Sequence, residues 1–339
     1  MSKCSVVILA AGEGTRMKSA VPKVLHAAAG IPMVERVVRA AEEAAGQRAI
    51  VVYGSGGDIV PKTLGDRCDY ALQSERKGSG HAVMMAEEAI RNSGSEYVAI
   101  IAGDMPLIRA ESIKKLIDAA TTGEYGGMLL TGHLENPTGY GRIVRDEEGN
   151  VLKIVEEVDA TPEEKAIKEV NISFYCFRTD ALLESFKELK PNNRKNEYYL
   201  TDCIGIIRGM GYRFGGIPLS DMSECEGVND RTQLAKATQV LYLRNAEKHM
   251  KNGVELIDPA NTYIGDDVLI GRDTFIYPGV VIEGNSVVGE NVTLYPGVRL
   301  TDAKIGSGSV LSNCTVVRSE VAENTQMKPY THMEDGTCI

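Results

Sequence analysis

Two spacings of hydrophobic residues divide the chain. Up to about residue 227, short apolar runs rich in β-branched residues alternate with longer stretches whose apolar residues recur at helical spacing. The runs predict buried parallel strands at residues 6–10, 49–53 and 97–101, and the stretches predict helices at residues 33–45, 82–91 and 112–120. This alternation predicts a doubly wound α/β sheet, whose ligands bind beyond the carboxyl ends of its strands.

A single helical stripe follows this region. Its apolar members are Leu234, Ala237, Val240, Leu241, Leu243, Ala246 and Met250. They predict one long helix that ends near residue 251, with Asn252-Gly253 as its C-cap. Such a helix would connect two folded parts.

The last part of the chain has a period of six. Apolar residues stand six apart at Ile264, Ile270, Ile276, Ile282, Val288, Leu294 and Leu300, and the period resumes after a slip at Ile305, Leu311 and Val317 and again at Val321, Met327, Met333 and Ile339. Small or β-branched residues follow four positions after the first six of these, at Val268, Thr274, Val280, Ser286, Val292 and Val298. A hexapeptide repeat predicts a parallel β-helix of roughly four coils. The predicted division is therefore 1–227, 228–251 and 252–339. By itself the β-helix is open to two interpretations, a stalk that holds subunits together or an acyltransferase, and we favour the stalk.

Composition excludes several classes of protein. The net charge of −10 argues against a nucleic-acid-binding protein, so any phosphate chemistry should occupy a local basic pocket. The seven cysteines form no C-x-x-C pair, which favours free thiols in a reducing cytosol over a disulfide framework or a zinc site. No apolar run approaches the roughly 20 residues that span a membrane. We expect a cytoplasmic protein with no membrane partner.

A glycine-rich turn after the first strand is the first candidate site. The segment "LAAGEGTRMKSAVPKVLH", residues 9–26, contains Gly12 and Gly14, and such a turn brings backbone N–H groups close to phosphate. It is neither a dinucleotide fingerprint, because Met17 stands where a third glycine is needed, nor a P-loop. Arg16 and Lys23 would neutralise charge on a departing pyrophosphate, although surface cations of this kind are often only solvated.

Asp104 is the second candidate. It follows the predicted strand in "YVAIIAGD", where Gly103 permits close approach of a ligand. From position alone, two interpretations remain equal: a turn or N-cap aspartate before Pro106, or a ligand of Mg²⁺.

Seven motifs occur in an order that resembles a known family. They are "LAAGEGTRMKSAVPKVLH", "LQSERKGSGHA", "IIAGDMPLI", "PTGYGRIV", "KIVEEVDA", "EYYLTD" and "EGVNDR". The chain resembles the uridylyltransferase half of the bifunctional N-acetylglucosamine-1-phosphate uridylyltransferase/glucosamine-1-phosphate acetyltransferase. The resemblance implies a Rossmann-like nucleotidyltransferase domain, a connecting helix and a short left-handed parallel β-helix.

The resemblance also implies roles for individual residues. Arg16, Lys23 and Asp104 would be catalytic. The nucleotide would be held by Ala11, Gly12, Gly14, Gln73, Gly78 and Ser79. The sugar phosphate would contact Gly141, Glu156, Asn171 and Asn229, with Tyr140 nearby. Asp104 and Asn229 would bind Mg²⁺.

Three departures from the family pattern stand out. Ser79 replaces a common threonine and keeps its hydroxyl. Asn171 is followed by Ile172-Ser173, where the family usually has a small residue and then glycine, so we expect a reshaped sugar pocket. The family continues beyond the position of Ile339 into the coils of the acetyltransferase, and Glu334-Asp335-Gly336 stands where the family has an Arg-Pro-Gly turn. We therefore expect a short form without acetyltransferase activity.

The implied reaction is nucleotidyl transfer. UMP would pass from UTP to N-acetylglucosamine 1-phosphate, giving UDP-N-acetylglucosamine and pyrophosphate for cell-envelope precursors. The second pKa of a phosphate monoester is about 6, so the nucleophile is already ionised at neutral pH and needs no general base. A related enzyme with another sugar or base, or a non-catalytic regulatory subunit, remains an alternative. The family also implies a homotrimer, and Tyr277, Val281 and Tyr295 are candidates for its contact faces.

Overall fold

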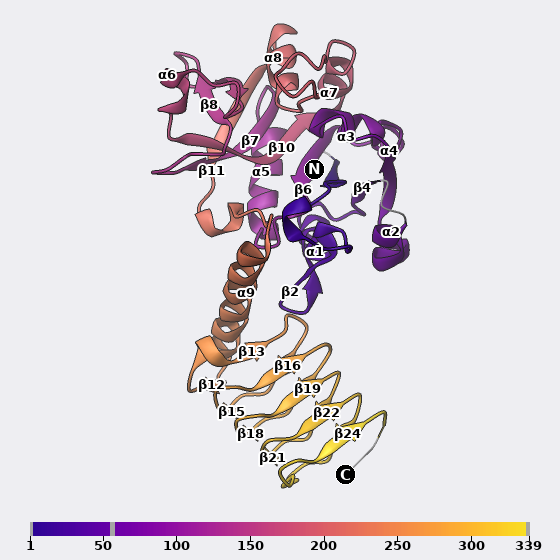
Figure 1. Cartoon of the computed structure of the whole chain (residues 1–339), viewed down its shortest axis with the longest axis vertical. Helices are drawn as coiled ribbons and strands as arrows, with labels where there is room; N and C mark the ends of the chain where they lie inside the picture. Colours follow the sequence, from indigo (N-terminus) through magenta and orange to yellow (C-terminus); the bar gives the residue numbers. More distant parts are fainter. Residues whose placement is uncertain (1–2, 55–57, 337–339) are drawn as a thin grey trace. The chain divides into compact units, whose positions relative to one another are not determined.

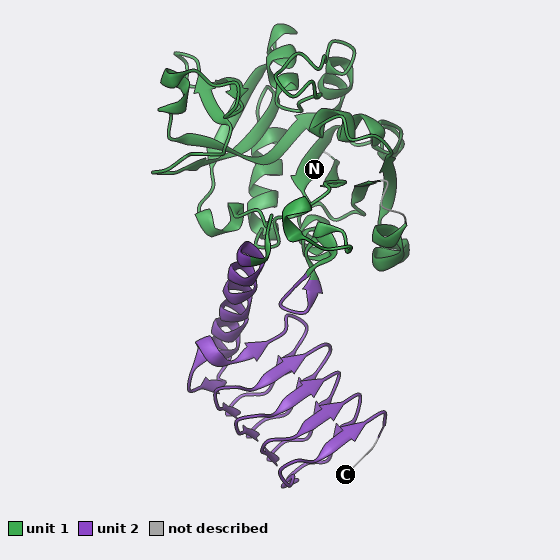
Figure 2. Ribbon diagram, viewed as in Figure 1, with its two compact units in different colours: residues 1–26, 32–231 green, residues 27–31, 232–339 purple. Residues whose placement is uncertain are grey.

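The computed structural model describes residues 3–54 and 58–336, and the chain divides into two compact units (Figure 2). Unit 1 contains residues up to His26 together with Pro32–Arg231, and unit 2 contains Ala27–Ile31 and the chain from Thr232 onward. Ile339, the last member of the six-residue pattern, lies outside the described residues.

Unit 1 is built on a mixed sheet in the order β11-β7-β10-β6-β1-β4-β5 (Figure 1). Its strands are β1 (Cys4–Ala10), β4 (Ile50–Gly54), β5 (Asp69–Gln73), β6 (Tyr97–Ala102), β7 (Tyr125–His133), β10 (Glu169–Arg178) and β11 (Arg213–Pro218). The three strands predicted from the sequence are β1, β4 and β6, and they are parallel neighbours, which confirms that prediction. The sequence did not predict β10, which runs antiparallel to both β6 and β7.

Helices cover both faces of this sheet because its strands are apolar on both sides. Along β1, Val6 and Ile8 enter one hydrophobic core with helices on one face of the sheet, while Val7 enters a second core with helices on the other face. The helices are α1 (Met33–Ala45), α2 (Ile59–Leu64), α3 (Ser79–Met85), α4 (Glu87–Ser93), α5 (Ala110–Thr122), α6 (Pro162–Lys165), α7 (Thr179–Ser185) and α8 (Asp202–Gly209).

The predicted helix at residues 82–91 is wrong as a single element. The chain breaks at Ala86, whose N–H bonds to the carbonyl of Val83, so that α3 ends there and α4 begins. Ala86 and Ile90 are both fully buried in the same core. The apolar pattern therefore continues across the break, and spacing alone could not reveal it.

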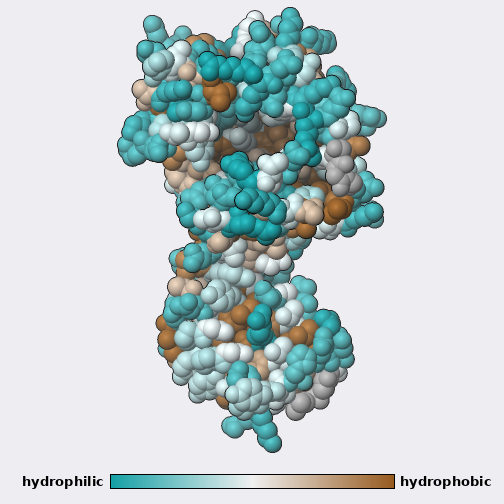
Figure 3. All heavy atoms as spheres, viewed as in Figure 1, coloured by the Kyte–Doolittle hydropathy of each residue, from teal (hydrophilic) through white to brown (hydrophobic). Residues whose placement is uncertain are grey.

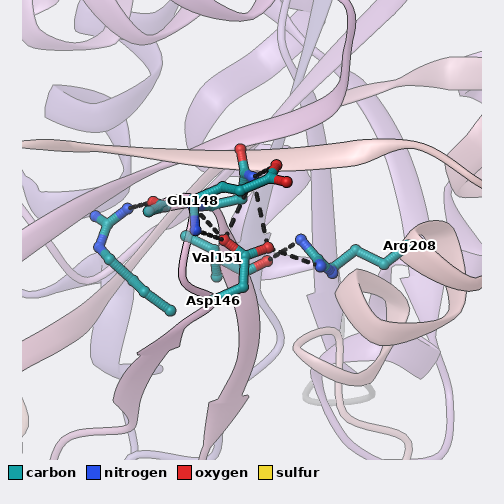
Figure 4. A network of polar contacts seen from close by, with 7 residues as sticks. Asp146, Glu148, Val151 and Arg208 are labelled. Atoms are coloured by element: carbon teal, nitrogen blue, oxygen red, sulfur yellow. Dashed lines mark hydrogen bonds and ion pairs between the residues drawn. The ribbon is translucent and has the colours of Figure 1, made fainter.

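A hairpin of β8 (Arg142–Arg145) and β9 (Val151–Val155) extends from the sheet, with β8 pairing to β10. Its turn is fixed by Asp146, whose carboxylate accepts hydrogen bonds from the backbone of Glu148 (3.1 Å) and of Asn150 (2.8 Å). Arg208 of α8 bonds the same carboxylate at 2.9 Å and the carbonyl of Val151 at 3.3 Å (Figure 4). This network ties the hairpin to a helix of the second core.

Unit 2 contains almost all of α9 (Arg231–Lys251), the long helix that the sequence predicts. The predicted C-cap is present: Gly253 has φ of 90°, and the N–H groups of Gly253 and Val254 bond back to Met250 and His249. The predicted stripe is only partly buried. Leu243 and Met250 are exposed, and the polar His249 is buried instead.

The rest of unit 2 is a β-helix of three parallel sheets, β12-β15-β18-β21, β13-β16-β19-β22-β24 and β14-β17-β20-β23. The strands are β12 (Glu255–Leu256), β13 (Tyr263–Ile264), β14 (Leu269–Ile270), β15 (Phe275–Ile276), β16 (Val281–Glu283), β17 (Val287–Val288), β18 (Thr293–Leu294), β19 (Arg299–Thr301), β20 (Lys304–Ile305), β21 (Val310–Leu311), β22 (Thr315–Val317), β23 (Glu320–Val321) and β24 (His332–Glu334). A short pair, β2 (Ala27–Ala28) and β3 (Ile31–Pro32), forms a separate sheet. The predicted β-helix is confirmed.

The six-residue pattern marks the inside of the coils, with one error. From Ile264 to Leu311 the predicted residues are buried, except Ile270, which is partly buried, and the small residues that follow four positions later are buried too. Val317, however, is only half-buried. Val316 takes the inward position and pairs with Leu300 of the coil before. The chain takes a five-residue step here, and the Val-Val pair conceals it in the sequence.

Candidate functional site

Three predicted site residues from distant segments meet at one point in unit 1. Lys23 donates hydrogen bonds from Nζ to Oδ2 of Asp104 and, at 3.0 Å, to Oδ1 of Asn229. Lys23 is 8% exposed, so its ammonium is largely removed from water. Asp104 follows β6 and Lys23 follows β1, and these parallel neighbours end at the same edge of the sheet. The N–H of Val228 bonds to the Asp104 carbonyl at 2.9 Å and holds Asn229 beside it.

Gly14 makes this arrangement possible. Its φ of 64° lies in the left-handed region, and a Cβ there would stand 2.4 Å from Cβ of Lys23. A side chain at this position would therefore displace Lys23. Gly12 differs, because no described atom beyond its own residue and its two chain neighbours lies within 4 Å of a Cβ built on it, and it is exposed.

Gln73, Gly78 and Ser79 form a second group near the end of β5. The Gln73 amide donates to the Gly78 carbonyl at 3.1 Å and lies 3.1 Å from Nδ1 of His81. Gly78 has φ of 103°, and a Cβ there would lie 2.5 Å from the carbonyl of Tyr198. The Ser79 hydroxyl accepts from the N–H of Leu200 at 3.1 Å. The glycine at position 78 and the hydroxyl at position 79 are therefore explained by close packing of this segment against residues 198–200.

Gly141, Glu156 and Asn171 form a third group at the base of the β8–β9 hairpin. A Cβ at Gly141 would lie 3.5 Å from Oε1 of Glu156 and 3.6 Å from Cβ of Asn171, and the Gly141 carbonyl accepts from the Asn171 N–H at 2.8 Å. Burial raises the pKa of the Glu156 carboxyl, and Asp202 adds to the shift. Tyr140 is partly buried beside them, and burial raises its pKa as well. The group offers amide, carboxyl and backbone partners for hydroxyl groups.

The structure accommodates Ile172-Ser173, the two residues after Asn171 that depart from the family pattern. Ser173 adopts φ of 61°, the left-handed conformation that favours glycine, and its N–H bonds to Oδ1 of Asn171 at 3.0 Å. Ile172 is 2% exposed and packs into the first core. The Asn171 amide donates to the Tyr175 hydroxyl at 2.7 Å. The larger residue beside Asn171 therefore fills the core.

Two cations near the glycine-rich turn behave differently from Lys23. Arg16 is exposed and makes no side-chain hydrogen bond or ion pair with the residues that the structure describes. Arg76, which sequence reasoning did not single out, donates from Nε to the Ala11 carbonyl at 3.3 Å and lies 3.2 Å from Oε1 of Glu13. Arg76 belongs to the quoted motif "LQSERKGSGHA". Its positive charge, opposite in sign to that of Glu13, is the one feature of the sequence that could have suggested this pair.

Asp104 and Asn229 offer a donor set that fits Mg²⁺. A carboxylate and an amide oxygen converge on one cation, the Lys23 ammonium, so their geometry already suits positive charge. Mg²⁺ is usually held by one or two carboxylates together with water and substrate oxygens. Among the described residues, no group of three or more His, Cys, Asp or Glu side chains is placed to share an ion.

Comparisons with known proteins agree on the kind of domain. Residues 6–152 match a MobA-like NTP transferase domain. The chain is 44% identical over 339 residues to bifunctional protein GlmU from Caldanaerobacter subterraneus, covering 100% of this chain and 74% of that protein. GlmU from Clostridium novyi is 44% identical over 336 residues, covering 99% of this chain and 73% of the relative.

A solved structure supports the fold alone. It is described as a glucose-1-phosphate thymidylyltransferase from Bacillus anthracis in complex with sucrose, and it superposes with a TM-score of 0.58 at 19% identity. The match covers 70% of this chain and 94% of that one. Within residues 3–54 and 58–336, no helix is both long and apolar enough to cross a bilayer.

Proposed function

The chain belongs to the GlmU family, and from that premise we propose that it transfers UMP from UTP to N-acetylglucosamine 1-phosphate, giving UDP-N-acetylglucosamine and pyrophosphate for cell-envelope precursors. Sugar-phosphate nucleotidyl transfer follows from the family and the domain; the particular sugar and base are our proposal. The observation that carries it is the meeting of Lys23, Asp104 and Asn229 beyond the carboxyl ends of β1 and β6.

In this proposal, catalysis comes from positioning the two substrates and from neutralising the negative charge of the phosphates. The sugar phosphate is already largely ionised at neutral pH, so no residue has to remove a proton from it. Lys23, held in place by two oxygens, and the exposed Arg16 neutralise charge that develops on the pyrophosphate leaving group. A preorganised, buried ammonium is more effective there than a mobile surface lysine, because it needs no reorganisation during the reaction.

Mg²⁺ would be held by Asp104 and Asn229, and when bound it screens the charge of the phosphate oxygens. Lys23 holds both oxygen ligands in place before any metal arrives. Ala11, Gly12 and Gly14 would face the phosphates and base.

The remaining proposed contacts divide between the two substrates. Gln73, Gly78 and Ser79 would recognise uracil. The group of Gly141, Glu156 and Asn171 would bind the sugar hydroxyls. It lies at the base of the β8–β9 hairpin, which the Arg208–Asp146 bond holds in place, and this supports a separate sugar subsite. Figure 3 shows a hollow in the face of unit 1 with hydrophilic residues around its rim.

We propose further that the protein is a homotrimer formed through its β-helix. Tyr277 and Tyr295 stack with ring centroids 4.7 Å apart, and Leu269 and Val287 are 61% and 40% exposed. Figure 3 shows hydrophobic residues reaching the surface of unit 2. The half-buried Val281 lies on a neighbouring sheet. A monomeric mass by light scattering at micromolar concentration would contradict the trimer.

A panel of substrates tests the function. Pyrophosphate release is measured with Mg²⁺ for N-acetylglucosamine, glucosamine and glucose 1-phosphates, each with UTP, dTTP, ATP and GTP. We expect the fastest release with UTP and N-acetylglucosamine 1-phosphate. A preference for another pair would assign a related pyrophosphorylase, and no release with any pair would assign a non-catalytic subunit. The variant Lys23→Ala is the control for contaminating activity.

A further inference from the structure

Arg76 and Glu13 form an ion pair across the glycine-rich turn that no part of the proposed mechanism uses. The NH1 of Arg76 lies 3.2 Å from Oε1 of Glu13, and its Nε donates to the Ala11 carbonyl at 3.3 Å. Both side chains are accessible, with exposures of 42% for Arg76 and 63% for Glu13. The two residues line one hollow with Gly12, Pro22 and Gly54. A cation therefore stands at the turn proposed to receive a triphosphate.

The contacts of Arg76 are easily exchanged. A solvent-exposed ion pair contributes little to stability because water and salt screen it. An arginine bonded to phosphate oxygens gains shorter, charge-assisted and often bidentate hydrogen bonds. Glu13, in contrast, is an anion in a turn proposed to hold anions, so it repels the ligand whenever Arg76 does not neutralise it.

The turn also needs a further cation. Lys23, proposed above to neutralise the leaving pyrophosphate, is almost wholly buried, and the Asp104 carboxylate already balances part of its charge. Of the cations described above, this leaves Arg16 as the accessible charge on the turn itself. A nucleoside triphosphate carries about four negative charges at neutral pH, counting the terminal phosphate as nearly dianionic.

Resting on the function proposed above, we propose that Arg76 is an additional phosphate-binding residue of the nucleotide site. In the free protein it is held by Glu13 and the Ala11 carbonyl. When UTP binds, its guanidinium leaves Glu13 for the triphosphate, so Glu13 competes with the nucleotide for one arginine.

Two single variants should act in opposite directions. Arg76→Gln should weaken UTP binding about tenfold, the loss expected for one charge-assisted hydrogen bond. Glu13→Gln should tighten UTP binding by about two- to threefold, because it removes a weak competitor and a repelling charge. Neither variant should change the affinity for uridine, which has no phosphate. Arg91→Gln is a matched control, since Arg91 forms an exposed pair with Glu87 on α4.

The double variant separates this role from simple neutralisation of Glu13. Dissociation constants are measured by calorimetry on the full chain for UTP and by ligand-observed NMR for uridine. If Arg76 binds phosphate, Glu13→Gln/Arg76→Gln should bind UTP about tenfold more weakly than Glu13→Gln. Equal affinity of those two proteins, or an unchanged or weaker UTP affinity of Glu13→Gln, would overturn the proposal. An equal loss for uridine would overturn the phosphate assignment.

The wild-type protein is assayed first to keep the two proposals apart. UTP binding and turnover by the wild type, with equal affinities across the four proteins, would overturn the role of Arg76 and leave the proposed function standing. Binding of UTP without turnover would overturn the proposed function, while the cycle of variants still decides the role of Arg76. Absence of UTP binding by the wild type would overturn both.

Discussion

Replacing Asp104 by asparagine tests whether the buried lysine at the site depends on its counter-charge. The substitution preserves shape and removes the negative charge, which leaves the Lys23 ammonium with neutral partners in a position where Lys23 is only 8% exposed. Two unit charges in hydrogen-bond contact attract with roughly 5 kcal/mol at an effective dielectric constant of about 20. Removing one member of a buried pair typically costs about 3–5 kcal/mol of stability. Because the Asp104 side chain is 22% exposed, we expect the lower end, about 3 kcal/mol.

A double-mutant cycle measures the coupling. Urea unfolding of the wild type, Asp104→Asn, Lys23→Met and the double variant is followed by far-UV circular dichroism, since the chain contains no tryptophan. We expect the double variant to be less destabilised than the sum of the singles by about 2 kcal/mol, and Asp104→Asn to lose most turnover. Asp118→Asn is the control, because its pair with Lys114 on α5 is exposed and should contribute under about 0.5 kcal/mol. Additive single effects, or an Asp104→Asn as stable as the control, would show that the Asp104 charge does not stabilise the buried Lys23.

Three further outcomes are expected. Burial raises the pKa of Glu156 in the folded protein, so this group adds stability below its unfolded pKa of about 4 and loses that contribution as pH rises through the folded pKa. Glu156→Gln should therefore melt at a higher temperature than the wild type at pH 7, with the gap closing towards pH 4, while KM for the sugar phosphate rises; an unchanged KM would argue against a sugar contact. Tyr330→Gly should raise the melting temperature by about 1–2 °C in calorimetry, because Tyr330 is 84% exposed and holds φ of 63°; a lower melting temperature would show that its side chain has a stabilising contact. The 339-residue chain should release no coenzyme A from acetyl-CoA and glucosamine 1-phosphate, because the exposed carboxylates of Glu334 and Asp335 stand where the family pattern has an arginine and would repel an anionic sugar phosphate; protein-dependent release would contradict this.

The edge of the sheet that carries the site could be predicted from the sequence. Alternation of apolar runs and helical stretches identifies β1 and β6 as parallel strands, and parallel strands end at one edge. That places Lys23 and Asp104 together. Asn229 follows no strand and lies far along the chain, so only the ordered motifs of the family pointed to it. A backbone bond from Val228 to the Asp104 carbonyl helps to bring it there, and no spacing rule anticipates that bond.

Features that depend on tertiary packing could not be predicted from the sequence. The run "EVNISFYCFR" of β10 is nearly continuous in apolar residues, and nothing in its composition distinguishes an antiparallel strand from a parallel one. The inward turn of Val316 in place of Val317 was hidden because the two residues are identical. The Arg76–Glu13 pair joins two of the quoted motifs, and neither residue stood out within its own motif. In all three cases the deciding interaction is with a neighbour distant in sequence.

The two glycines of the turn, which look equivalent in the sequence, respond to different constraints. Gly14 is required by the protein itself, because its φ of 64° and the nearness of Lys23 exclude a side chain. Gly12 has neither constraint: beyond its own residue and its two chain neighbours, no described atom lies within 4 Å of a Cβ built there, and the residue lines the hollow that Arg76 and Glu13 share. Nothing in the described fold therefore demands glycine at position 12. The proposed function gives a reason for the absence of a side chain there, because a phosphate chain that meets backbone N–H groups would need to approach the backbone closely.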